Sequence, residues 1–192
     1  MGELTHKAAR AAFGKAIDLT LKHVEKDREN GLLQLVDLTE KFMGNNFPAE
    51  SYVGARNLIR DPESKWMQYV NRALDEIHPN VIKQTALNLG FEAAFHGTKT
   101  IRAMRETHQC NIPWLILMDP TSACNLHCTG CWAAEYGHKL NLSYEDLDRI
   151  ITQGKELGIY FYMYTGGEPL VRKADIIKLC EKHYDCEFHA FT

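Results

Sequence analysis

The stretch PWLILMDPTSACNLHCTGC, residues 113–131, joins a short apolar run to three closely spaced cysteines. Residues 114–118 are continuously apolar and lie between two prolines, which is typical of a strand buried on both faces of a sheet. The following CNLHCTGC holds Cys124, Cys128 and Cys131. The stretch therefore predicts a buried strand that leads directly into a cysteine-rich loop.

The sequence after the cysteine loop alternates helical and strand-like patterns. Ser143 followed by Asp146 is a capping pattern for a helix, and residues 159–164 are again apolar and aromatic. An amphipathic helix around 176–180 then precedes a third strand over 188–191. This alternation predicts right-handed βαβ units with a parallel sheet, whose strands all end at one edge.

The N-terminal half of the chain carries helix signals throughout. Apolar residues recur at a period near 3.6, as expected of an all-α segment. We expect a first helix over about residues 4–28, broken by Gly31 before the next helix. Asp61 and Pro62 are expected to begin another helix, which turns three apolar side chains inward: Trp66, Val70 and Leu74.

Two domains follow from this change of pattern. Helical segments over about 79–93 and 101–107 complete an N-terminal helical domain, residues 1–110, of unknown role. Residues 111–192 form the second domain, so the expected fold class is α + α/β. The chain ends in or just after the third strand, and three parallel strands are too few to close a barrel, so we expect a truncated domain.

The composition is that of a soluble globular protein, with 45% hydrophobic and 24% charged residues. The net charge is -3 and the basic residues are scattered, so no nucleic-acid partner is expected. No apolar run approaches the ~18–20 residues that cross a bilayer. The opening MGELTHKAAR is typical of a polar helix rather than a signal peptide, and a cytoplasmic location is expected.

Six cysteines without a secretion signal favour metal binding over disulfides. A structural zinc site would need a fourth ligand, for which His127 or His138 is available in a Cys3His shell. An iron–sulfur cluster held by three thiolates would instead leave one iron open to a small molecule. The residues alone leave both interpretations open.

The turn Thr165-Gly166-Gly167-Glu168-Pro169 follows the second expected strand. It can be a plain tight turn that closes the strand. Alternatively, glycines without Cβ allow unusual φ angles and the close approach of a ligand. Glu168 could then accept hydrogen bonds from a ligand ammonium group.

Both motifs resemble those of one family. CNLHCTGC is similar to the CxxxCxxC loop of the radical S-adenosylmethionine (radical SAM) superfamily, and YTGGEP is similar to its Gly-Gly-Glu motif. The resemblance covers roughly residues 113–192 and implies the first half of a parallel (βα) partial TIM barrel, with three strands. No subfamily is identified.

The resemblance implies a site and a chemistry. Cys124, Cys128 and Cys131 would hold a 4Fe-4S cluster, and S-adenosyl-L-methionine would chelate the fourth iron. Gly166, Gly167 and Glu168 would bind that cofactor. The reduced cluster would cleave it to a 5'-deoxyadenosyl radical, which abstracts hydrogen from a substrate.

The family also sets expectations about partners. It implies an oxidoreductase or transferase supplied by an electron donor such as flavodoxin or ferredoxin. The substrate would be a small molecule or a peptide that the sequence does not identify, and this chain alone should be inactive or weakly active. The alternatives are a Cys3His zinc-binding interaction module and a non-catalytic iron–sulfur protein for electron transfer or sensing.

Residues near the motifs have weaker indications. Gly130 departs from the family, which often has an aromatic residue just before the third cysteine. His127 is expected to be a loop residue near solvent, whereas Tyr136 and His138 could shape the site. Trp132 is a possible cover of the cluster. The last group is the cysteines outside the motif, which are Cys110, Cys180 and Cys186. Of the last group, Cys180 is expected to behave as a small hydrophobic side chain on a helix.

Overall fold

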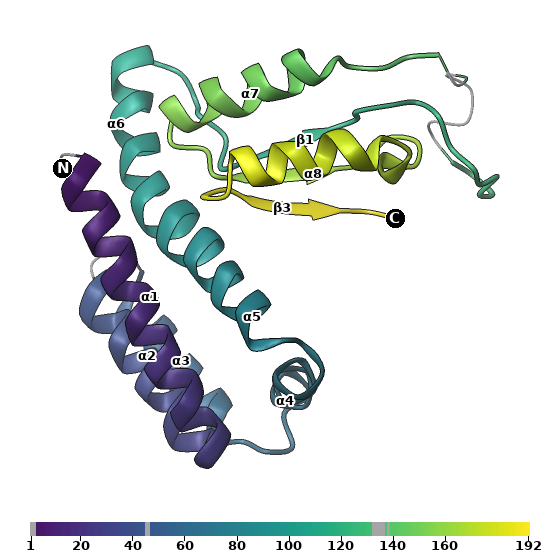
Figure 1. The fold of residues 1–192 in the computed structure, drawn as a ribbon. Coiled ribbons are helices and arrows are strands. Elements are labelled where there is room, and N and C mark those ends of the chain that lie inside the picture. The colour runs from purple at the N-terminus through teal and green to yellow at the C-terminus, as the bar shows by residue number, and fades with distance from the viewer. Residues whose placement is uncertain (1–2, 45–46, 132–136, 138) are drawn as a thin grey trace. The chain divides into compact units, whose positions relative to one another are not determined.

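The computed structural model describes residues 3–44, 47–131, 137 and 139–192 (Figure 1). The chain divides into two compact units, Met1–Leu87 and Asn88–Thr192. The sequence pattern places a domain boundary near residue 110, whereas this division falls earlier. The reason is that residues after Leu87 pack with the sheet: the Asn88 amide, for example, donates a hydrogen bond of 2.8 Å to the carbonyl oxygen of Cys186.

The first unit is helical in the part that the structure describes, as predicted. Its helices are α1 (Glu3–Lys26), α2 (Arg28–Met43), α3 (Ala49–Ile59), α4 (Lys65–Glu76) and α5 (Pro79–Thr85). Pro79 is the first residue of α5, where its missing N–H costs nothing. None of the described helices is both long and apolar enough to cross a membrane.

The expected break at Gly31 is wrong, because the chain turns at Asp27. The Asp27 side chain caps α2 by accepting a hydrogen bond of 3.2 Å from the backbone N–H of Asn30. Gly31 lies inside α2, where a Cβ would stand only 2.6 Å from the backbone nitrogen of Val24. The glycine therefore permits a close approach of α1 and α2 instead of ending a helix.

The expected inward position of Trp66 is also wrong. Helix α4 begins at Lys65 rather than at Pro62, and Trp66 is 69% exposed. The next residue, Met67, takes the buried position in a small core. Its neighbours there are Val24 and Leu32, with Val70 and Leu74 packed beside them as predicted.

The helical pattern after Pro79 does not stop near Ala93 as expected. Helix α5 continues into a π-helical segment, η1 (Ala86–Gly97), and then into α6 (Thr98–His108). Between Ala93 and Ile101 the sequence has no proline, and a single glycine is a weak helix breaker. The two short helices expected from the sequence are therefore one continuous helical run.

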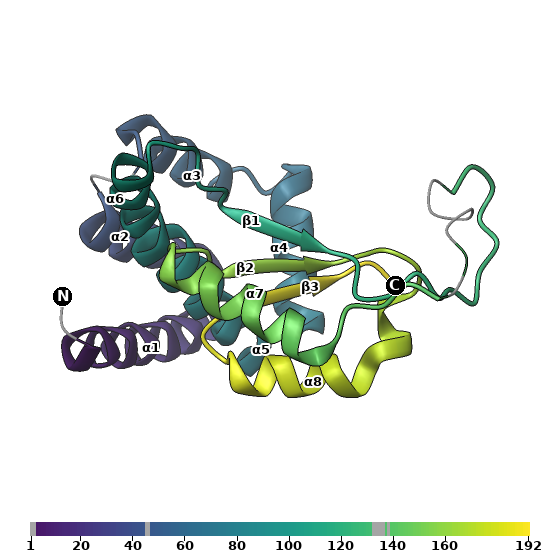
Figure 2. The same ribbon diagram turned by 90° about the horizontal axis from the view of Figure 1, so that it is seen from above.

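The second unit contains a parallel sheet, as the sequence predicts. Its strands β1 (Leu115–Met118), β2 (Phe161–Tyr164) and β3 (Glu187–Ala190) pair in the order β1-β2-β3. The helical segments between them are α7 (Tyr144–Glu156), η3 (Pro169–Arg172) and α8 (Lys173–Lys182). All three strands run in one direction, toward the end of the sheet where the cysteine loop extends (Figure 2). A three-stranded parallel sheet is consistent with part of a barrel. These three strands do not by themselves form a full barrel.

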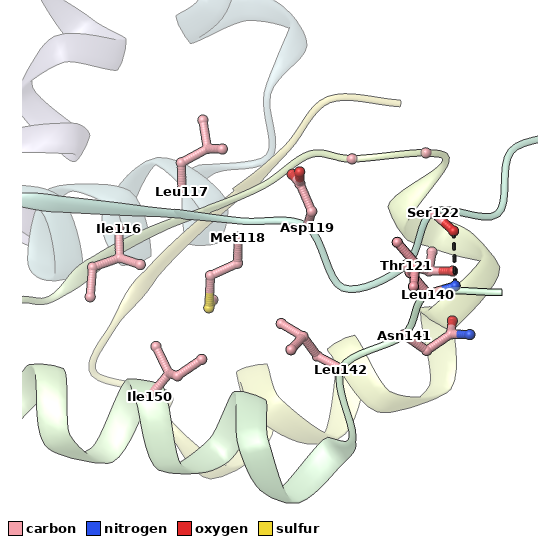
Figure 3. A pocket seen from close by; sticks show the side chains of 12 residues that line it. Ile116, Leu117, Met118, Asp119, Thr121, Ser122, Leu140, Asn141, Leu142 and Ile150 are labelled. Atoms are coloured by element: carbon pink, nitrogen blue, oxygen red, sulfur yellow. Dashed lines mark hydrogen bonds between the residues drawn. The ribbon is translucent and has the colours of Figure 1, made fainter. Parts of the chain in front are cut away.

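The two faces of β1 differ in burial. Ile116 and Met118 point toward Ile150 of α7, whereas Leu117 lies on the other side of the strand (Figure 3). Met118 is 4% exposed and Leu117 is 55% exposed. The prediction of burial on both faces is therefore wrong for Leu117, because no described element covers that part of the second face.

The first crossover helix, α7, begins and ends at the signals that the sequence predicts. The Ser143 hydroxyl accepts a hydrogen bond of 3.0 Å from the backbone N–H of Asp146, which confirms the cap of α7. Gly158, with a φ of +92°, follows the end of that helix. Leu147, Ile151 and Leu179, from α7 and α8, are fully buried against the sheet. These helices hold the strand ends that carry the candidate site.

Asp148 joins α7 to α8 and should make stability depend on pH. Its carboxylate lies 2.7 Å from Lys182 Nζ and 2.8 Å from His183 Nε2. Burial acts to raise the pKa of Asp148, but the hydrogen bonds from Lys182 and His183 outweigh it and lower that pKa below 3.8. The folded state is therefore stabilised by ionised Asp148 above pH 3.8, and this contribution is lost as the pH falls through the lowered pKa.

Asp148→Asn should accordingly reduce the free energy of unfolding at pH 7 by about 1–3 kcal/mol. The difference from wild type should shrink at pH below 3.8. Urea unfolding of both proteins at several pH values measures it. A difference that stays constant down to pH 3 would contradict this role of the carboxylate.

Candidate functional site

The two ends of the cysteine loop are hydrogen-bonded to each other. The backbone N–H of Ser122 donates to the carbonyl oxygen of Leu140 at 2.8 Å, and the N–H of Leu142 donates to that of Pro120 at 3.1 Å. The Leu140 N–H also donates to the Ser122 hydroxyl at 3.1 Å (Figure 3). The loop therefore leaves β1 and returns to α7 through a closed stem.

The Gly-Gly-Glu turn after β2 is bonded to the start of this loop. The backbone N–H of Gly167 donates to the carbonyl oxygen of Thr121 at 3.0 Å. The next N–H, that of Glu168, donates to the carbonyl oxygen of Ala123 at 2.8 Å. Parallel strands end at the same edge of a sheet, so the two motifs meet there even though the sequence separates them.

Both glycines of the turn are required by this contact. Gly166 has a φ of +99°, and a Cβ there would lie 2.8 Å from the carbonyl oxygen of Thr121. At Gly167 a Cβ would overlap the carbonyl oxygen of Ala123. The unusual φ expected at this turn is therefore present at Gly166. The close approach is made by the backbone of the cysteine loop, while the expected approach of a ligand stays a prediction.

Glu168 has one carboxylate oxygen engaged within the turn. Its Oε1 accepts a hydrogen bond of 2.9 Å from the backbone N–H of Leu170 and so caps the segment η3. For Oε2, the described part of the chain supplies no hydrogen bond. The capping bond fixes the orientation of the side chain and leaves one oxygen for a ligand cation.

One cavity of about 360 Å³ contains all six residues that the sequence indicates for the site. It lies at the strand ends and combines the thiols with the turn. Its lining comprises Ser122, Cys124, Leu126, His127, Cys128, Cys131, Gly137, Gly166, Gly167, Glu168, Phe191 and Thr192.

The three thiols share this cavity without forming a closed metal site. Within the described residues, no three His, Cys, Asp or Glu side chains converge as a metal site would require. Cys124 is half-buried and its Sγ lies 3.4 Å from the backbone nitrogen of Leu126, whereas Cys128 and Cys131 are exposed. Three thiols that line one cavity are a donor set that suits an iron–sulfur cluster, since thiolates are its usual ligands.

The structure describes only some of the other residues near the loop. His127 is exposed and lines the cavity, as expected of a loop residue near solvent. Trp132, Tyr136 and His138 lie outside the described residues. Gly130 has a φ of +74°, a conformation that favours glycine and that an aromatic residue adopts only with strain.

The cysteines outside the motif do not line this cavity. Cys110 is exposed and Cys186 is buried. Cys180 is half-buried against the core beside the sheet, and burial raises the pKa of its thiol to about 11. Cys180 therefore behaves as the expected small hydrophobic side chain, and its thiol stays protonated at neutral pH.

Phe191 and Thr192 line the cavity but were not indicated by the sequence motifs. Phe191 is 65% exposed, and its backbone N–H donates to the carbonyl oxygen of Tyr164 at 3.0 Å. The available signal was positional, since these residues directly follow the third parallel strand. They lie beside the two motifs because all three parallel strands end at the same edge of the sheet.

A second and larger cavity, of about 610 Å³, runs along β1 beside the first (Figure 3). Ile116, Met118, Leu142 and Ile150 give it a largely apolar wall. Gly166 and Gly167 line both cavities. The turn thus separates an apolar hollow from the thiol-lined one.

Comparison with known proteins agrees with the motifs. Residues 118–191 match the model of the Radical SAM superfamily. A protein named GTP 3',8-cyclase from Geobacter sulfurreducens is 51% identical over 57 residues, which are 28% of this chain and 18% of that protein. Proteins of the same name from Desulforamulus reducens and Thermodesulfovibrio yellowstonii are 37% and 36% identical over 83 and 84 residues. No solved structure matches significantly.

The matches are partial on both sides. The last two alignments each cover 41% of this chain, and they span 25% and 26% of the relatives' own length. The family match begins at the last residue of β1 and ends just after β3, so it includes both motifs and all three strand ends. The resemblance of this chain to the radical SAM superfamily is thereby confirmed, over the segment that carries the cysteine loop and the Gly-Gly-Glu turn.

Proposed function

We propose that the second unit binds a 4Fe-4S cluster and S-adenosyl-L-methionine side by side and generates an organic radical. The observation that carries this proposal is the single cavity lined by Cys124, Cys128, Cys131 and the residues of the Gly-Gly-Glu turn. Three thiolates leave one iron without a protein ligand. The turn beside them offers the groups that would hold a ligand on that iron.

The residues of the chain have separate tasks in this proposal. Cys124, Cys128 and Cys131 hold the cluster at the C-terminal ends of the strands. Glu168 Oε2 accepts a charge-assisted hydrogen bond from the ammonium group of S-adenosyl-L-methionine. When bound, the reduced cluster would supply the one electron needed to cleave this cofactor to methionine and a 5'-deoxyadenosyl radical. Phe191 lines the same cavity and offers an apolar contact to the bound cofactor.

The wider reaction follows from the same chemistry. The electron comes from a small donor protein such as flavodoxin or ferredoxin, and the radical takes a hydrogen atom from a small-molecule or peptide substrate. We limit the proposal to radical generation, because the alignments span only 18% to 26% of relatives that are named for cyclisation of GTP.

Metal analysis after anaerobic reconstitution tests this proposal against zinc binding. The 192-residue chain, treated with iron, sulfide and reductant, should hold about four irons and about four sulfides. It should be brown and absorb broadly in the visible range. A colourless protein that holds one zinc per chain would contradict the proposal and favour a zinc module.

A further test separates radical generation from simple electron transfer. Reconstituted protein is mixed with dithionite and S-adenosyl-L-methionine, and 5'-deoxyadenosine is measured by mass spectrometry. The product should exceed that of a sample without reductant. A protein with an intact cluster that neither binds the cofactor nor forms 5'-deoxyadenosine would instead be an electron carrier or sensor.

A further inference from the structure

Arg172 connects the turn and the loop that the two sequence motifs define. It is the last residue of η3, which begins directly after Glu168, and its side chain is 19% exposed. Its Nη1 donates to the carbonyl oxygen of Leu142 at 2.6 Å and to that of Pro120 at 3.2 Å. These two carbonyls lie at the two ends of the cysteine loop, so one guanidinium nitrogen reaches both.

The remaining nitrogens of Arg172 are held by α8. Nε and Nη2 donate to Asp175 Oδ2 at 2.8 Å and 2.6 Å. Because a guanidinium is planar, this double contact fixes the direction in which Nη1 points. Arg172 therefore connects three parts of the unit through hydrogen bonds, and we call this connection the tie. The three parts are the turn after β2, the first turn of α8 and the stem of the cysteine loop.

The tie complements the backbone contacts within the site. The turn already bonds to the first side of the loop at Thr121 and Ala123. Arg172 adds a hydrogen bond to the second side of the loop, at the carbonyl oxygen of Leu142. In the described part of the chain, the backbone N–H groups of the turn make no hydrogen bond to this side. With both contacts, the stem from which the thiols extend is held relative to the turn that carries Glu168 from two directions.

We infer that Arg172 is a positioning residue that sets the distance between the cluster held by the loop and the cofactor held by the turn. The inference rests on the proposed function. Arg172 lines neither cavity, so it would touch neither ligand directly. It acts through the carbonyl groups of Pro120 and Leu142.

Arg172→Lys tests the inference, because lysine keeps the charge but cannot bond Asp175 and both carbonyls together. The reconstituted variant should retain about four irons per chain. Its dissociation constant for S-adenosyl-L-methionine, from titration of the EPR signal of the reduced cluster, should rise about 10-fold or more. Hydrogen exchange at the backbone amides of Ser122 and Leu142 should become faster.

Two further variants complete the experiment. Arg149→Lys is the matched control, since Arg149 is 64% exposed and pairs with Asp146 on its own helix; it should bind the cofactor as wild type does. Asp175→Asn weakens the hold on Arg172 and should give an intermediate dissociation constant. Both variants share the readouts of Arg172→Lys.

The outcomes separate this inference from the proposed function. Unchanged cofactor affinity in a cluster-containing Arg172→Lys protein would overturn the inference alone. Parallel loss of iron in Arg172→Lys and Asp175→Asn would also overturn it, because Arg172 would then serve general folding of the loop. A wild-type chain that takes up no cluster would overturn the proposed function itself.

Discussion

Replacement of Cys128 by serine should reduce the iron content of the reconstituted protein from about four irons per chain to fewer than about one. Serine is a poor ligand for cluster iron, and the three thiols are the only cysteine side chains that line the described cavity. The same loss is expected for Cys124→Ser and Cys131→Ser. Iron and sulfide analysis, with the visible absorption spectrum, measures it.

Cys110→Ser is the matched control for this prediction. Cys110 is exposed, as Cys128 is, but lies outside the loop and the cavity. It should leave the iron content unchanged. The fold should survive both substitutions, since surface changes of this size alter the free energy of unfolding by about 0.5 kcal/mol or less. Full iron content in Cys128→Ser would refute the assignment of the loop.

Gly167→Ala should have the second largest effect, on both stability and cofactor binding. The added Cβ would overlap the carbonyl oxygen of Ala123, which is backbone and cannot rotate away. The turn must then separate from the loop. We expect a loss of about 1–3 kcal/mol in the free energy of unfolding and an affinity for S-adenosyl-L-methionine at least ~10-fold lower.

The control for Gly167→Ala is the same substitution where there is room. Gly54 lies within α3, and a Cβ there would meet no atom within 4 Å. Gly54→Ala should stabilise its helix by about 0.5–1 kcal/mol. Urea unfolding and cofactor titration of both variants decide the matter. If Gly167→Ala unfolds and binds as wild type does, the close contact between turn and loop is not a feature of the protein in solution.

The meeting of the two motifs was largely predictable because parallel strands bring distant segments to one edge. The apolar runs that became β1 and β2 each end in a motif, and the parallel pairing of Met118 with Tyr164 then places those motifs together. The cap at Ser143 was equally readable, because it depends on residues three positions apart. Local patterns and strand direction were sufficient for these features.

The errors concern which elements pack against each other across the fold. Trp66 and Met67 are adjacent, and periodicity alone did not decide which of them faces the core. Leu117 has an apolar side chain, as a buried strand residue would, yet its exposure depends on whether another segment covers that face of the sheet. Gly31 resembles a helix breaker, although the neighbouring helix is what requires it.

Arg172 was missed for a different reason. Its partners at the loop are carbonyl oxygens, which every residue has, so the sequence around Pro120 and Leu142 carries no mark of the contact. Only the pair Arg172 and Asp175, three residues apart on adjoining helical turns, could be suspected locally. Side-chain contacts to distant backbone require the three-dimensional structure.

The most direct test of the central claim is pulsed EPR on the reduced, reconstituted protein with S-adenosyl-L-methionine labelled with 15N at its amino group. If the cavity holds cluster and cofactor together, the cluster signal should change on addition of the cofactor and show a resolved coupling to the labelled nitrogen. A signal that is unchanged by saturating cofactor, with no nitrogen coupling, would contradict the claim that the thiols and the Gly-Gly-Glu turn form one site.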